Sequence, residues 1–278
     1  MDVRMDGRVA VITGGSTGLG LAMAKEFAAS GGSVAILARK ADALAAAKAE
    51  VQKAAGKANI KIEAYSCDVS KAAPIADTIK KVVADFGKVD ILVNNAGISH
   101  AKPFDTVTDE DWQGDLDLKL FAAIRLARAA LPGMRERKWG RIVNVLNIGA
   151  KAPGANSTPT SVSRAAGLAL TKALSQENGQ HNVLVNAMLV GLIDSDQWQR
   201  RHKTAAGEGK TYERIPLICP CGQAGYGPWP CRPGTPGRSC PRPPRSCGGA
   251  AIGRSRSGPP AWRSRARRAG HSPGSSPW

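Results

Sequence analysis

The sequence predicts an α/β protein built on a doubly wound parallel sheet. Short, nearly continuous apolar runs alternate with helical segments over the first 190 residues. Strands of this kind are buried on both faces, which requires helices on both sides of a parallel sheet. The first strand also ends in a glycine-rich turn, at the edge where doubly wound sheets bind their ligands.

Six strands are predicted from their apolar, β-branched composition and the turn residues that end them: Val9–Thr13, Ser33–Ala38, Lys61–Cys67, Val89–Val93, Arg141–Leu146 and Asn182–Leu189. Five helical segments lie between these strands, and glycines end the first three of them: Thr17–Ser30, Ala41–Ala55, Pro74–Phe86, Asp109–Arg137 and Ser161–Glu177. In the long fourth segment we expect Pro132 to bend or break the helix, because proline has no backbone N–H group.

The composition changes abruptly near residue 213. Of the 278 residues, the last 65 hold 13 of the 18 prolines, 11 arginines, 11 glycines and five of the six cysteines. Residues 1–213 carry 28 basic and 22 acidic side chains, so +11 of the net charge of +17 belongs to the tail. We therefore expect a folded domain over residues 1–213 and a disordered tail over residues 214–278, since proline-rich, aperiodic chain cannot build a core.

Three explanations of the tail stay open. The first is a genuine disordered basic arm. The second is a zinc module, although the five cysteines form no paired CxxC motif: Cys219, Cys221, Cys231, Cys240 and Cys247. The third, which we favour, is an out-of-frame translation of GC-rich DNA, because the tail has no Lys, Asp, Glu or Asn. Resequencing the gene tests this hypothesis, and an intact single frame would count against it.

The composition also bears on the class of protein. No run of about 18 apolar residues is present, so we expect no membrane span. Residues 1–15 lack the basic start, apolar run and cleavage site of a secretory signal, so we expect a cytoplasmic protein. Cys67, the single cysteine of the body, agrees with a reducing compartment. Nucleic-acid binding through the arginine tail rests on charge alone, and we do not expect it.

A glycine-rich turn, Thr13–Gly20, joins the first strand to the first helix. Glycines let the backbone approach a pyrophosphate without a Cβ clash. The helix N-terminus behind them offers N–H groups and the positive end of its dipole. Because the turn stands at the strand-to-helix junction that this mechanism requires, we interpret it as a dinucleotide-binding loop rather than only a tight turn.

Residues 5–200 resemble the short-chain dehydrogenase/reductase family. The resemblance rests on the TGxxxGxG turn, on NNAG at Asn94–Gly97, on Cys67–Val69 after the third strand and on Val185–Ala187 in the sixth. It implies a Rossmann fold and an oxidoreductase that uses a nicotinamide nucleotide. The cofactor-binding residues that it implies are Gly14, Ser16, Thr17, Gly18, Leu19, Gly20, Asp68, Val69, Asn95, Ala96, Gly97, Arg164, Gly191, Ile193 and Ser195.

The resemblance also implies lid helices and a seventh strand near the C-terminus, and nothing after Arg214 matches them. If the tail is genuine, one edge of the sheet lacks its partner and part of the substrate pocket is missing. An exposed sheet edge predicts low stability or poor solubility.

The end of the second strand favours NADP(H) over NAD(H). An acidic residue at the position of Ala38 would accept the ribose hydroxyls of NAD, but none is present. Arg39, helped by Lys40, can instead pair with the 2′-phosphate of NADP. The alternative is that both are solvated surface charges.

The residues that carry the chemistry in this family are all substituted here. The resemblance implies an Asn–Ser–Tyr–Lys set, in which the Tyr phenol gives a proton to the carbonyl oxygen and Lys binds the ribose and lowers the Tyr pKa. In the same set Ser orients the carbonyl and Asn supports a water relay. Lys119 stands at the Asn position, Asn147 at the Ser position, Thr160 at the Tyr position and Arg164 at the Lys position.

These substitutions change what each position can do. The Thr160 hydroxyl is a poor general acid, and its oxygen falls about 4 Å short of the reach of a phenol. Arg164 can hydrogen-bond the ribose but is a poor proton donor, whereas Asn147 can donate to a carbonyl oxygen. Lys119 either has a pKa lowered by a desolvated cleft or extends its amine to the surface.

Two functions follow from the sequence. In the first, the protein interconverts a small-molecule carbonyl and an alcohol by hydride transfer, with Lys119 or water replacing the phenol. Losing general acid help costs about 10²–10⁴-fold in rate, so turnover would be slow. In the second, it binds NADP(H) without turnover, as a sensor or structural partner. We favour the first, because most replacements are polar hydrogen-bond donors, and we expect a homodimer through helices 109–130 and 161–177, with no metal.

Overall fold

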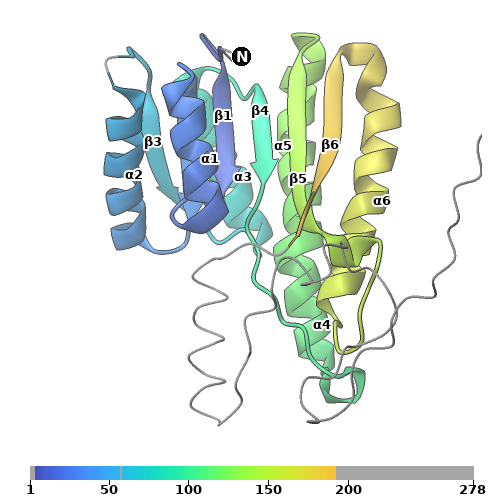
Figure 1. The fold of residues 1–278 in the computed structure, drawn as a ribbon. Helices are drawn as coiled ribbons and strands as arrows, with labels where there is room; N and C mark the ends of the chain where they lie inside the picture. Colours follow the sequence, from blue (N-terminus) through green and yellow to red (C-terminus); the bar gives the residue numbers. More distant parts are fainter. Residues whose placement is uncertain (1–3, 57, 192–278) are drawn as a thin grey trace, which may run out of the picture. The chain divides into compact units, whose positions relative to one another are not determined.

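The computed structural model describes residues 4–56 and 58–191, and a parallel six-stranded sheet runs through them (Figure 1). The strands stand in the order β3-β2-β1-β4-β5-β6, and all five pairings are parallel. Their bounds are β1 Val9–Thr13, β2 Ser33–Ala38, β3 Ile62–Ser66, β4 Ile91–Asn94, β5 Gly140–Asn147 and β6 Val183–Val190. This order confirms the doubly wound fold, with its switch point between β1 and β4.

Helices cover both faces of the sheet. Their bounds are α1 Gly18–Ala29, α2 Ala41–Ala55, α3 Ala72–Phe86, α4 Asp109–Leu116, α5 Ala122–Glu136 and α6 Thr160–Asn178. One apolar cluster joins α1 and α2 to the sheet through side chains such as Ala24, Val51 and Ile36. A second joins α3 and α5 to the opposite face through Ile79, Leu126 and Leu37. Each central strand therefore has a buried side chain on both faces, as its continuous apolar composition predicts.

The predicted helix over residues 109–137 is interrupted, but not at the proline. We expected Pro132 to bend or break the helix; it lies inside α5, so a break at that residue is wrong, and a bend stays a prediction. The interruption comes earlier, where a π-helical turn at Asp117–Phe121 separates α4 from α5. Single π-helical turns occur often at functional sites. Within the described residues, no helix combines the length and the apolar character needed to cross a lipid bilayer.

The carboxyl ends of the strands carry the segments that could form a site. The turn after β1, the segment after β4 and the start of α6 all lie at this edge, and α4 extends beyond it (Figure 1). In open α/β sheets ligands bind outside the carboxyl ends of the strands.

Candidate active site

The glycine turn after β1 is closely packed. Gly14 and Gly18 have φ angles of 65° and 55°, which only glycine adopts readily. A Cβ on Gly20 would lie 2.1 Å from the carbonyl oxygen of Gly14, and one on Gly15 would lie 2.9 Å from Ile36 Cβ. Nothing lies within 4 Å of a Cβ built on Gly18. The turn is therefore pressed against the sheet on its inner side and open at Gly18.

Hydrogen bonds join the turn to the NNAG segment after β4. Thr13 Oγ1 accepts from the backbone N–H groups of Asn95 at 2.9 Å and Ala96 at 3.0 Å. The Asn95 side chain donates back to the carbonyl oxygens of Thr13 at 3.0 Å and Gly14 at 3.3 Å. Residues about 80 positions apart in the sequence thus form one rigid wall of the cleft.

The N-terminus of α1 is arranged to receive an anion. Its first N–H groups have no partner within the helix, as at every helix start. Thr17 occupies the capping position, makes no side-chain capping bond, and no acidic residue lies in the first turn. The amide groups and the positive end of the helix dipole therefore fit a phosphate at this edge of the sheet.

On the far side of the turn, Arg39 and Asp68 follow β2 and β3. Arg39 is exposed. Burial raises the pKa of the Asp68 carboxyl, but hydrogen bonds from Ser70 and the charges of Arg39 and Lys71 outweigh it, and the net pKa is lowered. Ser70 donates to Asp68 Oδ1 through its backbone N–H at 3.0 Å and its hydroxyl at 2.7 Å. Asp68 is thus fixed and ionised beside Arg39.

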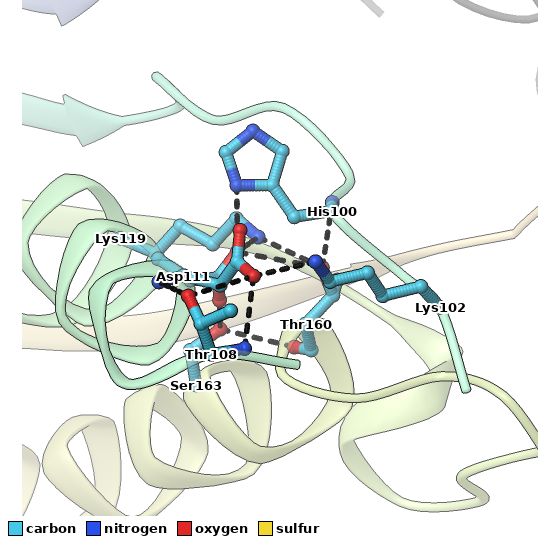
Figure 2. Close-up of polar contacts among 8 residues, drawn as sticks. His100, Lys102, Thr108, Asp111, Lys119, Thr160 and Ser163 are labelled. Atoms are coloured by element: carbon cyan, nitrogen blue, oxygen red, sulfur yellow. Dashed lines mark hydrogen bonds and ion pairs between the residues drawn. The ribbon is translucent and has the colours of Figure 1, made fainter. Parts of the chain in front are cut away.

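A buried acid–base pair lies at the position of the expected catalytic set. Lys119 Nζ is ion-paired with Asp115 Oδ1 and donates to Thr160 Oγ1 at 3.0 Å (Figure 2). The Lys119 side chain is 1% exposed and that of Asp115 is fully buried. Lys119 therefore does not extend its amine to the surface, which removes that alternative.

Asp115 was not predicted as a site residue from the sequence. The local helix geometry brings its side chain to that of Lys119. The two residues are four apart, so they share one face where α4 passes into the π-helical turn. A capping box between Thr108 and Asp111 fixes the start of α4, and Lys102 pairs with Asp111 (Figure 2). The i, i+4 spacing of an acid and a base was the signal that could have identified the pair.

Two further residues complete the cluster. Ser163 Oγ donates to Asp115 Oδ2 at 2.6 Å, and its side chain is buried. The His100 backbone N–H donates to Thr160 Oγ1 at 3.0 Å, and His100 Nδ1 lies 3.8 Å from Asp115 Oδ1. Both Asp115 oxygens therefore face polar groups, as a buried carboxylate requires. Neither His100 nor Ser163 belongs to a motif that the sequence analysis recognised.

Arg164 and Asn147 each have a buried polar atom without a hydrogen-bond partner in the described part of the chain. Arg164 Nη1 donates to the Val145 carbonyl at 2.8 Å, but Arg164 Nε and Asn147 Oδ1 have no partner within the described part of the chain. Burial lowers the pKa of the Arg164 guanidinium, and the Asp115 carboxylate opposes this effect. A Cβ on Gly97 would lie 2.7 Å from Arg164 Nη2. Such buried unpartnered atoms fit a polar ligand.

A pocket lies beside Lys119 and is lined by both polar and apolar residues, including Asn94, Leu118, Lys119, Asn144, Arg164 and Gly167. Asn94 donates to Asn144 Oδ1 at 2.8 Å, and Asn144 donates to Thr171 Oγ1 at 2.8 Å. The structure thus brings Lys119, Thr160 and Arg164 together at one end of the cleft.

The remaining predicted residues lie towards the C-terminus. Gly191 is exposed, whereas Ile193 and Ser195 lie outside the described residues. The domain boundary at 213 and the five tail cysteines also lie outside them.

Comparison with known proteins agrees with the fold. The family model for short chain dehydrogenase matches residues 8–206. D-β-hydroxybutyrate dehydrogenase of Cupriavidus necator is 35% identical over 189 residues, or 68% of this chain and 72% of that protein. Acetoacetyl-CoA reductase of Shinella zoogloeoides is 34% identical over 219 residues, or 78% and 85%. The crystal structure of L-sorbose reductase from Gluconobacter frateurii, complexed with NADPH and L-sorbose, has a TM-score of 0.70 at 34% identity and covers 75% of this chain and 79% of that one.

The parallel sheet and these likenesses define the class as a nucleotide-binding α/β oxidoreductase. The chain belongs to the short-chain dehydrogenase family, whose members use NAD(P) and act on CH–OH and C=O groups.

Proposed function

We propose that this protein is an NADP(H)-dependent oxidoreductase that interconverts a carbonyl and an alcohol, with Lys119 as the group that gives and takes the proton. The observation that carries the proposal is the 3.0 Å contact between Lys119 Nζ and Thr160 Oγ1. Thr160 occupies the position of the tyrosine in the resemblance, so the amine supplies a proton donor where the phenol is missing.

The cofactor would lie along the carboxyl ends of β1 and β4. The open N-terminus of α1 supports binding of the pyrophosphate by the turn, from Gly14 to Gly20. The unpartnered Arg164 Nε and the absence of a side chain on Gly97 support placement of the nicotinamide ribose beside Arg164, at the end of the cleft away from the glycine turn. Val69, Asn95 and Ala96 stay in the predicted set with Gly191, Ile193 and Ser195.

The preference for NADP(H) is supported by charge. Arg39 is exposed after β2, and Lys40 follows it. An arginine pairs with a phosphate through two charge-assisted hydrogen bonds. The related L-sorbose reductase structure contains NADPH.

Each residue of the cluster has a chemical role in this proposal. A bound nicotinamide cofactor would supply the hydride for the carbonyl carbon. Lys119 donates a proton to the carbonyl oxygen, and the Thr160 hydroxyl, in contact with Nζ, orients the amine. The Asn147 amide hydrogen-bonds the developing oxyanion. Arg164 keeps its charge throughout and stabilises the ribose and the oxyanion without exchanging a proton.

The test is oxidation of NADPH against a panel of carbonyl compounds. The named relatives suggest a 3-oxoacyl thioester, a 3-oxo acid and a keto sugar as first members. Replacing the pair together, as Asp115→Leu with Lys119→Met, removes the amine without leaving a buried charge. We expect this variant to lose about 10²–10⁴-fold in rate while NADPH still binds. Equal rates in the variant and the wild type would contradict the role of Lys119.

A second candidate function is NADP(H) binding without turnover. The observation that favours it is the burial of Lys119, which is 1% exposed and already engaged by Asp115. A structural ion pair of this kind does not have to exchange protons. Rates at background for every carbonyl compound, together with tight NADPH binding, would select this function.

The remaining predictions concern assembly and location. Phe121 and Val162 are exposed apolar side chains in the two regions, 109–130 and 161–177, through which we propose pairing of two copies. Exposed apolar patches often mark protein interfaces. Sedimentation of the purified protein tests this, and a monomer at all concentrations would contradict it. The cytoplasmic location stays a prediction from the sequence.

A further inference from the structure

His100 connects the buried acid–base pair to the protein surface. Its side chain is 39% exposed, whereas Asp115 beside it is fully buried. Its ring nitrogen Nδ1 lies 3.8 Å from Asp115 Oδ1. Figure 2 shows the other ring nitrogen pointing away from Lys119. The backbone N–H of His100 is held by Thr160 Oγ1 at 3.0 Å, so the residue is fixed against the cluster.

A proton that leaves Lys119 has to be replaced from solvent. The Lys119 side chain is 1% exposed, so bulk water does not reach the amine directly in this arrangement. Arg164, whose charge acts on Asp115, does not exchange protons at physiological pH. Among the described residues that face the pair, histidine is the side-chain type that ordinarily gains and loses a proton near neutral pH.

The two oxygens of Asp115 have different surroundings. Oδ2 accepts from Ser163 Oγ at 2.6 Å. Oδ1 faces Lys119 Nζ, Thr160 Oγ1 at 3.4 Å and His100 Nδ1. Ser163 therefore holds the carboxylate with one oxygen shared between the amine and the imidazole, which is the geometry of a relay.

We propose that His100 and Asp115 form the proton-supply route of Lys119. The proposal rests on the proposed function, in which Lys119 protonates the carbonyl oxygen. Once Lys119 has given its proton to the carbonyl oxygen, the Asp115 carboxylate accepts the Nδ1 proton of the His100 imidazolium on Oδ1, and the neutral Lys119 amine then takes that proton from Asp115. The neutral ring keeps its proton on the exposed nitrogen Nε2, so it turns to bring Nδ1 to water, takes up a proton there and turns back towards Asp115. One proton enters from solvent for each proton that Lys119 gives up, and oxidation of an alcohol runs the same route backwards.

Proton transfer from His100 to Asp115 needs only a small movement of the imidazole ring. A hydrogen bond between a ring nitrogen and a carboxylate has a length of about 2.7–3.2 Å, so the imidazole has to approach Asp115 by about 0.6–1 Å. A half-exposed side chain makes such a movement quickly compared with turnover. His100 is thus a positioning and relay residue for Lys119, with no contact to the hydride.

The experiment follows exchange of the Lys119 ammonium hydrogens with water, by NMR on the full chain labelled with ¹⁵N-lysine and without cofactor. The signal is assigned by its loss in Lys119→Arg. We expect His100→Gln to slow the exchange by at least about tenfold, since positioned acid–base groups commonly contribute 10²-fold or more. His181→Gln, which changes a histidine in the 3₁₀ turn Gly179–His181 before β6, serves as the matched control and should leave the exchange unchanged. An exchange rate in His100→Gln equal to that of the wild type would overturn the proposal.

A second readout uses the holoenzyme. His100→Ala should lose turnover that added imidazole restores, whereas imidazole should not restore the Asp115→Leu, Lys119→Met double variant. Slowed exchange in a protein that reduces no carbonyl compound would support the route and contradict the proposed function. Normal exchange in His100→Gln would contradict the route, and so would turnover of His100→Ala that imidazole does not change. If the wild type reduces carbonyl compounds in that case, the proposed function still stands.

Discussion

Replacing Lys119 with methionine should lower the free energy of unfolding by about 3–5 kcal/mol, because it leaves a buried carboxylate without its counter-ion. Asp115 is fully buried, so water cannot solvate the charge that remains. Its other contacts are the hydroxyls of Ser163 and Thr160 and the imidazole of His100 at 3.8 Å. Hydroxyl donors stabilise a carboxylate far less than a paired ammonium does, so they do not compensate for the loss.

Replacing both Lys119 and Asp115 should recover most of the stability that Lys119→Met alone loses. A buried ion pair exchanged for apolar side chains of similar volume is often neutral or stabilising by about 1–4 kcal/mol. Here the change also removes one of the two acceptors of the Ser163 hydroxyl, which can still donate to the Thr160 carbonyl at 3.0 Å, so the lost hydrogen bond costs about 0.5–1.5 kcal/mol. The Asp115→Leu, Lys119→Met variant should therefore lie within about 2 kcal/mol of the wild type, and the two positions should be coupled by at least about 3 kcal/mol.

Chemical unfolding followed by circular dichroism measures these differences on the full chain. Lys25→Met is a suitable control, since Lys25 pairs with Glu50 at 3.2 Å while both side chains are largely exposed. An exposed pair contributes about 0–1 kcal/mol, so this variant should change little. Equal, small losses of unfolding free energy in Lys25→Met and Lys119→Met would refute the conclusion that Lys119 and Asp115 form a buried pair in which each residue depends on the other.

Three further predictions concern the turn, the cofactor and the acid limit of stability. Gly20→Ala would place a Cβ 2.1 Å from a backbone oxygen of the turn, so NADPH affinity should fall strongly, whereas Gly179→Ala, with helical backbone angles and nothing within 4 Å of its Cβ, should leave affinity unchanged in calorimetry. Arg39→Ala should weaken NADPH binding by about 10–100-fold without changing NADH binding, because a charged hydrogen bond contributes about 1.5–3 kcal/mol; equal effects on both cofactors would argue against a phosphate contact. The hydrogen bond from Lys102 lowers the pKa of Asp111 from 3.8 to about 2. Because the folded-state pKa is the lower one, the stabilisation is complete above pH 3.8 and is lost as the pH falls towards 2. Wild type and Asp111→Asn should therefore differ in stability near neutral pH and converge near pH 2 in an acid unfolding series, and a constant difference would contradict this cause.

The strands were predictable from the sequence because burial on both faces leaves a strong signal. Val9–Thr13 and Ser33–Ala38 were predicted with the bounds that the structure gives. The π-helical turn at Asp117–Phe121 was not predicted, because a single extra residue in a helical turn does not change local composition. Pro132 was expected to bend or break the helix, and α5 continues through it without a break.

The site was predictable only in part. Lys119, Thr160 and Arg164 were found through the positions of a motif, and the structure brings them together. Asp115 stands among other acidic residues of α4, and nothing in the sequence distinguishes a buried aspartate from its exposed neighbours except its spacing to Lys119. His100 reaches the cluster across 15 residues of loop and helix, a contact that depends on tertiary structure.

Calorimetric titration of the full chain with NADPH and with NADH tests the central claim most directly. The account predicts saturable binding of NADPH that is tighter than binding of NADH, since the turn at Gly14–Gly20 holds the pyrophosphate and Arg39 the additional phosphate. Folded protein that binds neither nucleotide would contradict it, and tighter binding of NADH would contradict the role of Arg39.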